Sequence, residues 1–185
     1  TSPNANIPPD AILNQKAEFL LRAPNPEASW HGQSSWLPVR QINGTITAFS
    51  RVKSSSDEAL YECVLEHELA LLNRNFRSAV YTDVTVPEVV TQLMKESRYF
   101  EGFNIDFDSL RCTYPRREMI IQWKETDLEF IRRLLAEVGI WFRLENHSTT
   151  PTETVVIFGD SASRYIISEK KFPFVRRSGM TSQIG

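Results

Sequence analysis

The stretch EMIIQWKETDLEFIRRLLAEVGIWFRLE, residues 118–145, carries the clearest structural pattern in the chain. Thr126 and Glu129 have the spacing of a capping box, in which each side chain satisfies a backbone N–H of the other residue. Apolar residues then recur at helical intervals up to Gly139, a typical helix stop: Leu128, Ile131, Leu135 and Val138. The runs EMIIQW and IWFRLE have strand character. We predict strand, helix and strand, with a crossover long enough for a parallel pair whose adjacency stays open.

A second helix is predicted in TVPEVVTQLMKES, residues 85–97. Thr85 and Glu88 repeat the capping box, and Pro87 stands in the first turn, where its missing N–H costs little. One apolar stripe follows the helical period: Val86, Val89, Val90 and Leu93. Because neither helix shows a second apolar face, we expect each to cover a sheet or barrel as a lid.

Strand patterns also occur outside these two stretches. Strand patterns cover residues 16–22, 39–53, 60–69, 153–160 and 171–175. Within the second of these, Asn43-Gly44 is either a tight hairpin turn or a close backbone approach inside one long strand. Residues 24–38 are rich in Pro, Ser and Gly and are predicted to be a surface loop. The fold class is therefore α+β, dominated by strands, with two amphipathic helices.

The composition argues against nucleic-acid binding and against a membrane anchor. The chain has 185 residues, 41% of them hydrophobic, which is enough for one core. Its 21 basic and 23 acidic residues give a formal charge of -2, so nucleic-acid binding is not expected. The sequence has no run of about 20 apolar residues for a membrane anchor and no basic leader, and we expect synthesis in the cytoplasm. Cys63 and Cys112 are expected to be reduced, buried thiols.

The run VVIFGDSAS, residues 155–163, raises the possibility of a serine nucleophile. Gly-Asp-Ser after an apolar strand resembles the first block of GDS-type esterases, and would make Ser161 the catalytic residue. A serine needs a histidine base, which in those enzymes lies far downstream. No histidine follows Ser161 in this chain. The pattern therefore favours a strand that ends in a Gly-Asp turn, with Ser161 structural.

Other patterns for chemistry are weak. Three histidines occur, and they are isolated in the sequence: His31, His67 and His147. His67 lacks a second histidine at the spacing of a helical zinc motif. His67 is expected at a strand end. Glu125, Asp127 and Glu129 gather at a helix start, where carboxylates cap free N–H groups. We therefore predict no catalytic residue, no metal site and no cofactor.

Three segments resemble, in this order, those of VgrG proteins, the spike components of bacterial type VI secretion, and of the related late-control protein D family of tailed phages: TVPEVVTQLMKES, YPRREMIIQWKETDLEFIRRLLAEVGIWFRLE and VVIFGDSAS. The middle segment is the most specific. Upstream, residues 42–74 resemble the family's long strand, turn and returning strand. The resemblance is weakest at residues 24–38, and it implies a loop insertion there.

This resemblance implies a β-barrel-rich, phage baseplate hub-like domain with two flanking amphipathic helices. Residues 1–185 would be a partial N-terminal hub domain, mostly its first barrel, from a longer protein. The full-length protein would be a non-catalytic homotrimer that connects the Hcp hexamer tube to the membrane-puncturing spike. It would contact baseplate proteins and spike-borne effectors, assemble in the bacterial cytoplasm and be injected through the type VI apparatus. The alternative is a phage or prophage tail hub of the late-control D type.

Overall fold

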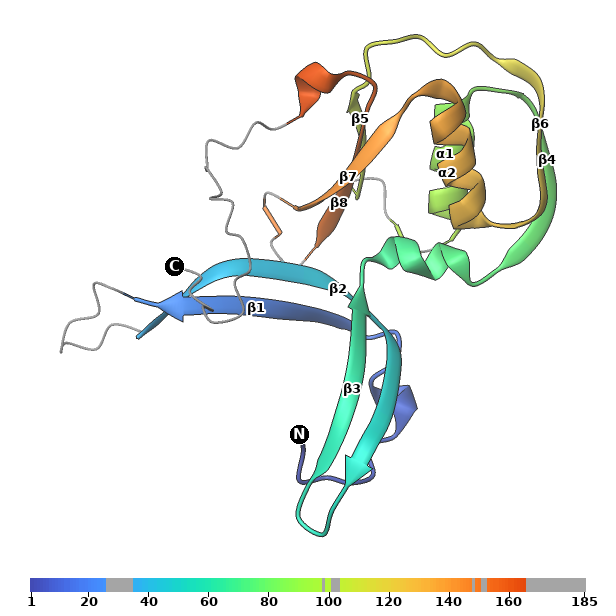
Figure 1. The fold of residues 1–185 in the computed structure, drawn as a ribbon. Helices are drawn as coiled ribbons and strands as arrows, with labels where there is room; N and C mark the ends of the chain where they lie inside the picture. The colour runs from blue at the N-terminus through green and yellow to red at the C-terminus, as the bar shows by residue number, and fades with distance from the viewer. Residues whose placement is uncertain (26–34, 98, 101–103, 148, 151–152, 166–185) are drawn as a thin grey trace, which may run out of the picture.

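The computed structural model describes residues 1–25, 35–97, 99–100, 104–147, 149–150 and 153–165 (Figure 1). The strands are β1 (Lys16–Pro24), β2 (Trp36–Ser54), β3 (Ala59–Glu66), β4 (Phe76–Val84), β5 (Ile105–Ser109), β6 (Arg117–Thr126), β7 (Trp141–Asn146) and β8 (Thr154–Gly159). The α-helices are α1 (Val86–Glu96) and α2 (Asp127–Val138), and short 3-10 turns are η1 (Pro9–Ala11), η2 (Glu68–Asn73) and η4 (Ala162–Arg164). None of the helices in these described residues is long and apolar enough to cross a membrane.

The strands form three open sheets. One is the antiparallel sheet β1-β2-β3, one is the antiparallel pair β4-β6, and one has the order β5-β8-β7. In the third sheet, β5 and β8 are parallel and β7 and β8 are antiparallel. The α+β class is confirmed. Within the described residues the sheets do not close on themselves, so the barrel remains a prediction.

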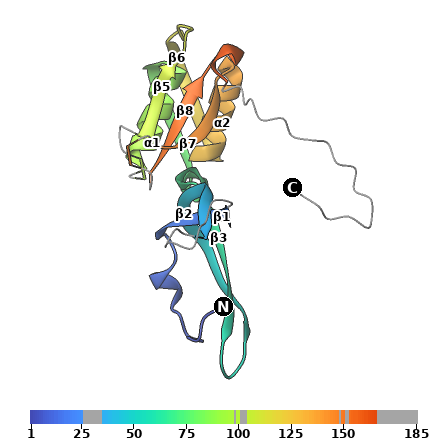
Figure 2. The same ribbon diagram turned by 90° about the vertical axis from the view of Figure 1, so that its left-hand side faces the viewer.

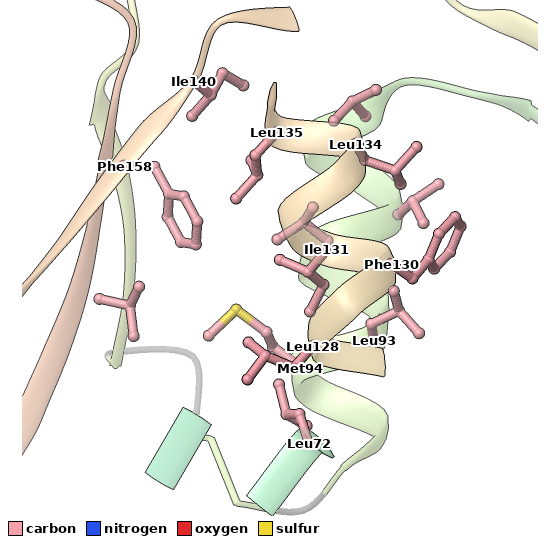
Figure 3. Close-up of a cluster of buried hydrophobic side chains, with 14 of the residues drawn as sticks. Leu72, Leu93, Met94, Leu128, Phe130, Ile131, Leu134, Leu135, Ile140 and Phe158 are labelled. Carbon is pink, nitrogen blue, oxygen red and sulfur yellow. The ribbon is translucent and has the colours of Figure 1, made fainter. Parts of the chain in front are cut away.

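The two strands that flank α2 lie in different sheets. β6 pairs with β4, and β7 pairs with β8, so the two strands are not the parallel neighbours that their long crossover would have permitted. The reason is that α2 is buried on two sides. Figure 3 shows Ile131 and Leu135 pointing toward Phe158 of β8, while Phe130 and Leu134 point the other way.

The helices are therefore the middle layer of a sandwich. The Phe130 ring stacks on Tyr81 of β4 with ring centroids 5.7 Å apart, and both side chains are buried. Ile131 and Leu135 are buried on the side of the β5-β8-β7 sheet, and Phe158 is only 1% exposed. The prediction that each helix has a single apolar face and acts as a lid was wrong for α2. Its sequence stripe omitted Phe130 and Leu134, which face the β4-β6 pair.

Both predicted capping boxes are confirmed. In α1, the Thr85 hydroxyl accepts from the N–H of Glu88 and the Glu88 carboxylate accepts from the N–H of Thr85. In α2, Thr126 and Glu129 exchange the same two bonds at 3.1 and 2.8 Å. Gly139 ends α2 with a φ of 73°, a left-handed conformation that glycine adopts without strain.

The β1-β2-β3 sheet projects away from the sandwich, and we call it the arm (Figures 1 and 2). Asn43 and Gly44 lie inside β2, so the hairpin alternative was wrong. A Cβ on Gly44 would stand 2.2 Å from the carbonyl oxygen of Glu66, which confirms a close backbone approach. The loop predicted at 24–38 was too long at both borders, because Pro24 of β1 pairs with Trp36 of β2. Residues 26–34 lie outside the described residues. The strand predicted at 171–175 also lies outside them.

Candidate assembly surfaces

Ser161 has the role of a cap. It precedes η4, and its Oγ accepts from the N–H of Ser163 at 3.3 Å and lies 2.9 Å from the Ser163 Oγ. In the described residues, the hydrogen bonds of Ser161 are made with Ser163 and none involves a histidine. The geometry is that of a short turn after β8, and its non-catalytic role stays a prediction.

Asp160, next to Ser161, is the more connected residue of this turn. One carboxylate oxygen accepts from the N–H groups of Arg111 and Cys112 at 2.8 and 2.7 Å, and from the Tyr114 hydroxyl at 3.0 Å. The backbone N–H of Cys112 is the largest cause that lowers the pKa of Asp160, to about 2. Burial and the neighbouring carboxylate raise the pKa of Tyr114. Asp160 therefore ties the end of β8 to the segment between β5 and β6.

The acidic residues at the start of α2 have three different partners, so their prediction as caps holds only for Glu129. Asp127 accepts from Arg77 Nε at 2.6 Å and from Gln122 Nε2 at 2.9 Å. Glu125 pairs with Arg133 at 2.6 Å, and this hydrogen bond lowers the pKa of Glu125. The two pairs bind α2 to β4 and β6. Both are structural contacts, and the Arg77–Asp127 pair joins residues 50 positions apart in the sequence.

The histidines do not converge. His67 lies at the strand end as predicted, but the strand predicted to run to residue 69 ends at Glu66, because His67 caps η2: its Nδ1 accepts from the N–H of Leu69. Burial lowers the pKa of His67, and Glu68 partly opposes this effect. His147 Nδ1 accepts from the N–H of Thr149 at 3.3 Å, and His31 lies outside the described residues. In the described parts of the chain, no group of three or more His, Cys, Asp or Glu could hold a metal ion.

An open cleft of about 460 Å³ lies where the arm meets the sandwich. Its volume is within the range of ligand pockets. However, two of its polar side chains already form hydrogen bonds within the protein: Glu66 accepts from Thr47, and Asn73 accepts from the Thr126 hydroxyl at 2.9 Å. Among the described residues that line the cleft there is no serine, threonine or cysteine that could act as a nucleophile.

Exposed apolar side chains are the main unexplained feature. On the outer face of the β4-β6 pair, Val80 and Ile121 are cross-strand neighbours and are 60% and 44% exposed. Three more large side chains are exposed on these strands: Phe76, Met119 and Trp123. We call this set the ribbon face. Contiguous exposed apolar surface of this kind is typical of protein interaction sites.

The arm carries a second exposed set. Nine large apolar side chains of the arm are exposed: Phe19, Leu21, Trp36, Leu37, Val39, Ile42, Val52, Leu60 and Val64. Cys63 on β3 is exposed as well, and so is Cys112, so the prediction of buried thiols was wrong. The strand periodicity indicated which residues share a face. It could not indicate that the arm would stand away from the core and leave the Cys63 thiol exposed.

Comparison with known proteins gives one family and several relatives. The family model of the phage tail baseplate hub (GPD) matches residues 1–184. The type VI secretion system spike protein VgrG5 of Pseudomonas aeruginosa is 27% identical over 98% of this chain, which covers 21% of that protein. The actin cross-linking toxin VgrG1 of Vibrio cholerae is 27% identical over 86% of the chain, and 13% of the toxin is covered.

A solved structure agrees with these relatives. The E. coli c3393 protein superposes with a TM-score of 0.74 and 34% identity, over 89% of this chain and 41% of that one. That protein is described as a component of the type VI secretion system with structural similarity to the T4 bacteriophage tail proteins gp27 and gp5. This chain thus spans less than half of the solved relative.

Proposed function

Because this chain belongs to the phage tail baseplate hub family, we propose that it is the hub part of a type VI secretion spike protein. Two observations favour type VI secretion over the second candidate, a phage or prophage tail hub. The relatives reported above include a type VI spike protein, and the solved relative is described as a type VI component. Genes for tube and sheath proteins of a secretion apparatus beside the gene would support the proposal, and a prophage tail cluster would favour the alternative.

The complete protein is proposed to be a homotrimer that joins the Hcp tube to the spike. The observation that carries this proposal is the pair of uncovered apolar surfaces, the ribbon face and the arm. An obligate contact buries more than about 2,000 Å² and is more apolar than ordinary surface. Since this chain covers 41% of its solved relative, the remaining contact area would come from the rest of the protein. Assembly would take place in the bacterial cytoplasm, before injection, with baseplate proteins and effectors as further partners.

Sedimentation of two proteins tests this assembly. The complete protein is expected to sediment as a trimer, and the 185-residue chain alone as a monomer or a weakly associating species. Immobilised complete protein is expected to retain purified Hcp hexamers, with an unrelated hexamer of similar size as the control. A monomeric complete protein would contradict the hub proposal.

The domain is also proposed to be non-catalytic. Ser161 caps η4 instead of facing a base, and this is the support for the proposal. Hydrolysis of short acyl esters should therefore be the same for the wild-type chain and for Ser161→Ala. Turnover that disappears in this variant would establish a serine esterase instead.

A further inference from the structure

The arm has almost no core of its own. Among the residues of its three strands, the buried ones are Ala59 on β3 and a short run at the middle of β2, namely Asn43, Gly44 and Thr45. A small sheet is stable only when an apolar face packs against something else. The exposed apolar side chains of the arm therefore need cover that the described residues do not supply.

In the half of the arm formed by β1 and residues 36–45 of β2, one face is turned toward the sandwich. Asn43 Nδ2 on this face donates to Asn146 Oδ1 of β7 at 3.3 Å. Successive strand residues point to opposite faces, so Ile42 lies on the open face. Its cross-strand neighbour Phe19 and the next pair, Leu21 and Arg40, share that face. These four residues are the β1 patch, whose aromatic member is 53% exposed.

In the other half, formed by β3 and residues 46–54 of β2, the chain's own N-terminal segment covers one face. The Tyr61 hydroxyl donates to the carbonyl oxygen of Asn4 at 2.8 Å, and the segment runs beside these strands in both views (Figures 1 and 2). Leu60, Glu62 and Val64 alternate with the tyrosine and lie on the opposite, open face. We call these three residues the β3 patch.

The two patches lie on opposite faces of one sheet. Ile46 shares the face of Ile42, because no bulge interrupts β2 between them, and it pairs with Leu65 of β3. Leu65 and Val64 are consecutive, so their side chains point to opposite faces. Each end of the arm thus has one face covered by its own chain and one open apolar face.

The patches also lie in halves of opposite charge. Residues 16–24 and 36–45 hold three basic residues and one acidic residue, and residues 46–66 hold two basic residues and four acidic residues. Neither Arg40 nor Glu62 forms an ion pair with the residues that the structure describes. Surfaces that are apolar at the centre, opposite in charge and located at different ends of one sheet fit a second copy of the same chain.

We propose that the arm is a head-to-tail contact between subunits, in which the β1 patch of one copy packs on the β3 patch of the next. This inference rests on the proposed trimeric hub, and it names the surface that such a trimer would use. A contact between two different patches can repeat around an axis and close into a ring. The apolar side chains exclude water at the centre, and Arg40 facing Glu62 fixes the register.

Charge reversal in the complete protein tests the contact. Arg40→Glu and Glu62→Arg each place like charges opposite one another, and each is expected to weaken the trimer by about ten-fold or more in sedimentation. The variant with both changes is expected to recover the wild-type association. Arg132→Glu on the exposed side of α2 is the matched control and should leave the trimer intact. Unchanged thermal melting of the single variants will show that they fold.

The outcomes separate the two proposals. A trimeric wild type whose association is unaffected by either single reversal overturns the arm contact and leaves the hub assignment standing. Dissociation by the single changes without recovery in the double variant overturns the pairing of Arg40 with Glu62. A monomeric wild type overturns the trimeric hub and the arm contact together.

Discussion

Replacing Phe130 by Ala tests whether α2 is the middle layer of a sandwich. The side chain is fully buried, its ring stacks on Tyr81 at 5.7 Å, and the Arg133 guanidinium lies 5.1 Å from the ring centroid. Deletion of an aromatic side chain from such a site costs about 3–5 kcal/mol through lost transfer energy and the cavity left behind. Since a domain is stable by about 5–15 kcal/mol, Phe130→Ala should remove a large share of the free energy of unfolding.

Urea unfolding followed by circular dichroism measures this loss as a lower midpoint at an unchanged slope. Leu135→Ala, on the face toward β8, is the companion variant and should cost about 2–5 kcal/mol. Arg132→Ala, exposed on the same helix, is the control and should stay within about 0.5 kcal/mol of wild type. If Phe130→Ala costs less than about 1 kcal/mol while Leu135→Ala costs its expected amount, α2 packs on one sheet only, and the middle-layer description is refuted.

Three further outcomes follow from the geometry. Thr126→Ala should lower the free energy of unfolding by about 1 kcal/mol in urea titrations, and Thr126→Ser should largely keep the cap; an equal loss in both would show that the methyl group matters instead. Gly44→Ala should speed amide exchange in β2 and β3, because the new Cβ would meet the Glu66 carbonyl at 2.2 Å; unchanged exchange would disprove the close approach. The pKa of Asp160 is lowered to about 2, so the ionised carboxylate stabilises the fold above the ordinary carboxyl pKa, and this stabilisation is lost as the pH falls toward 2. The difference in free energy of unfolding between wild type and Asp160→Asn should therefore shrink over the same pH range. A difference that stays constant with pH would contradict this prediction.

The sequence alone predicted both α-helices and six of the strands, but it did not predict β4 or β5. Capping boxes, helix stops and strand periods depend on residues a few positions apart, so Thr85 with Glu88, and Thr126 with Glu129, could be paired without knowledge of the rest of the chain. The α+β class follows from the same local patterns, whereas the family was identified from the resemblance of whole segments such as residues 114–145. Because no histidine follows Ser161 in the sequence, a structural serine was predicted there, and the cap that Ser161 forms on η4 is consistent with that prediction.

The candidate surfaces needed the tertiary structure. Alternation along β3 assigns Val64 and Leu65 to opposite faces, but nothing local tells which face another segment covers. The same holds for the cysteines, because the exposure of Cys63 depends on where the arm stands relative to the core. The Arg77 to Asp127 pair likewise joins residues 50 positions apart.

The sequence therefore determined both α-helices with their caps and six of the strands, but neither β4 nor β5, and it assigned too narrow an apolar face to α2. Only the tertiary structure decided that β6 and β7 enter different sheets, that α2 is buried on both sides, and that the arm keeps open faces at its two ends. The physical reason is the sequence separation over which each interaction acts. Backbone hydrogen bonding and side-chain period act over a few residues, whereas burial is set by contacts between segments far apart in the chain, which several arrangements of the same elements could satisfy.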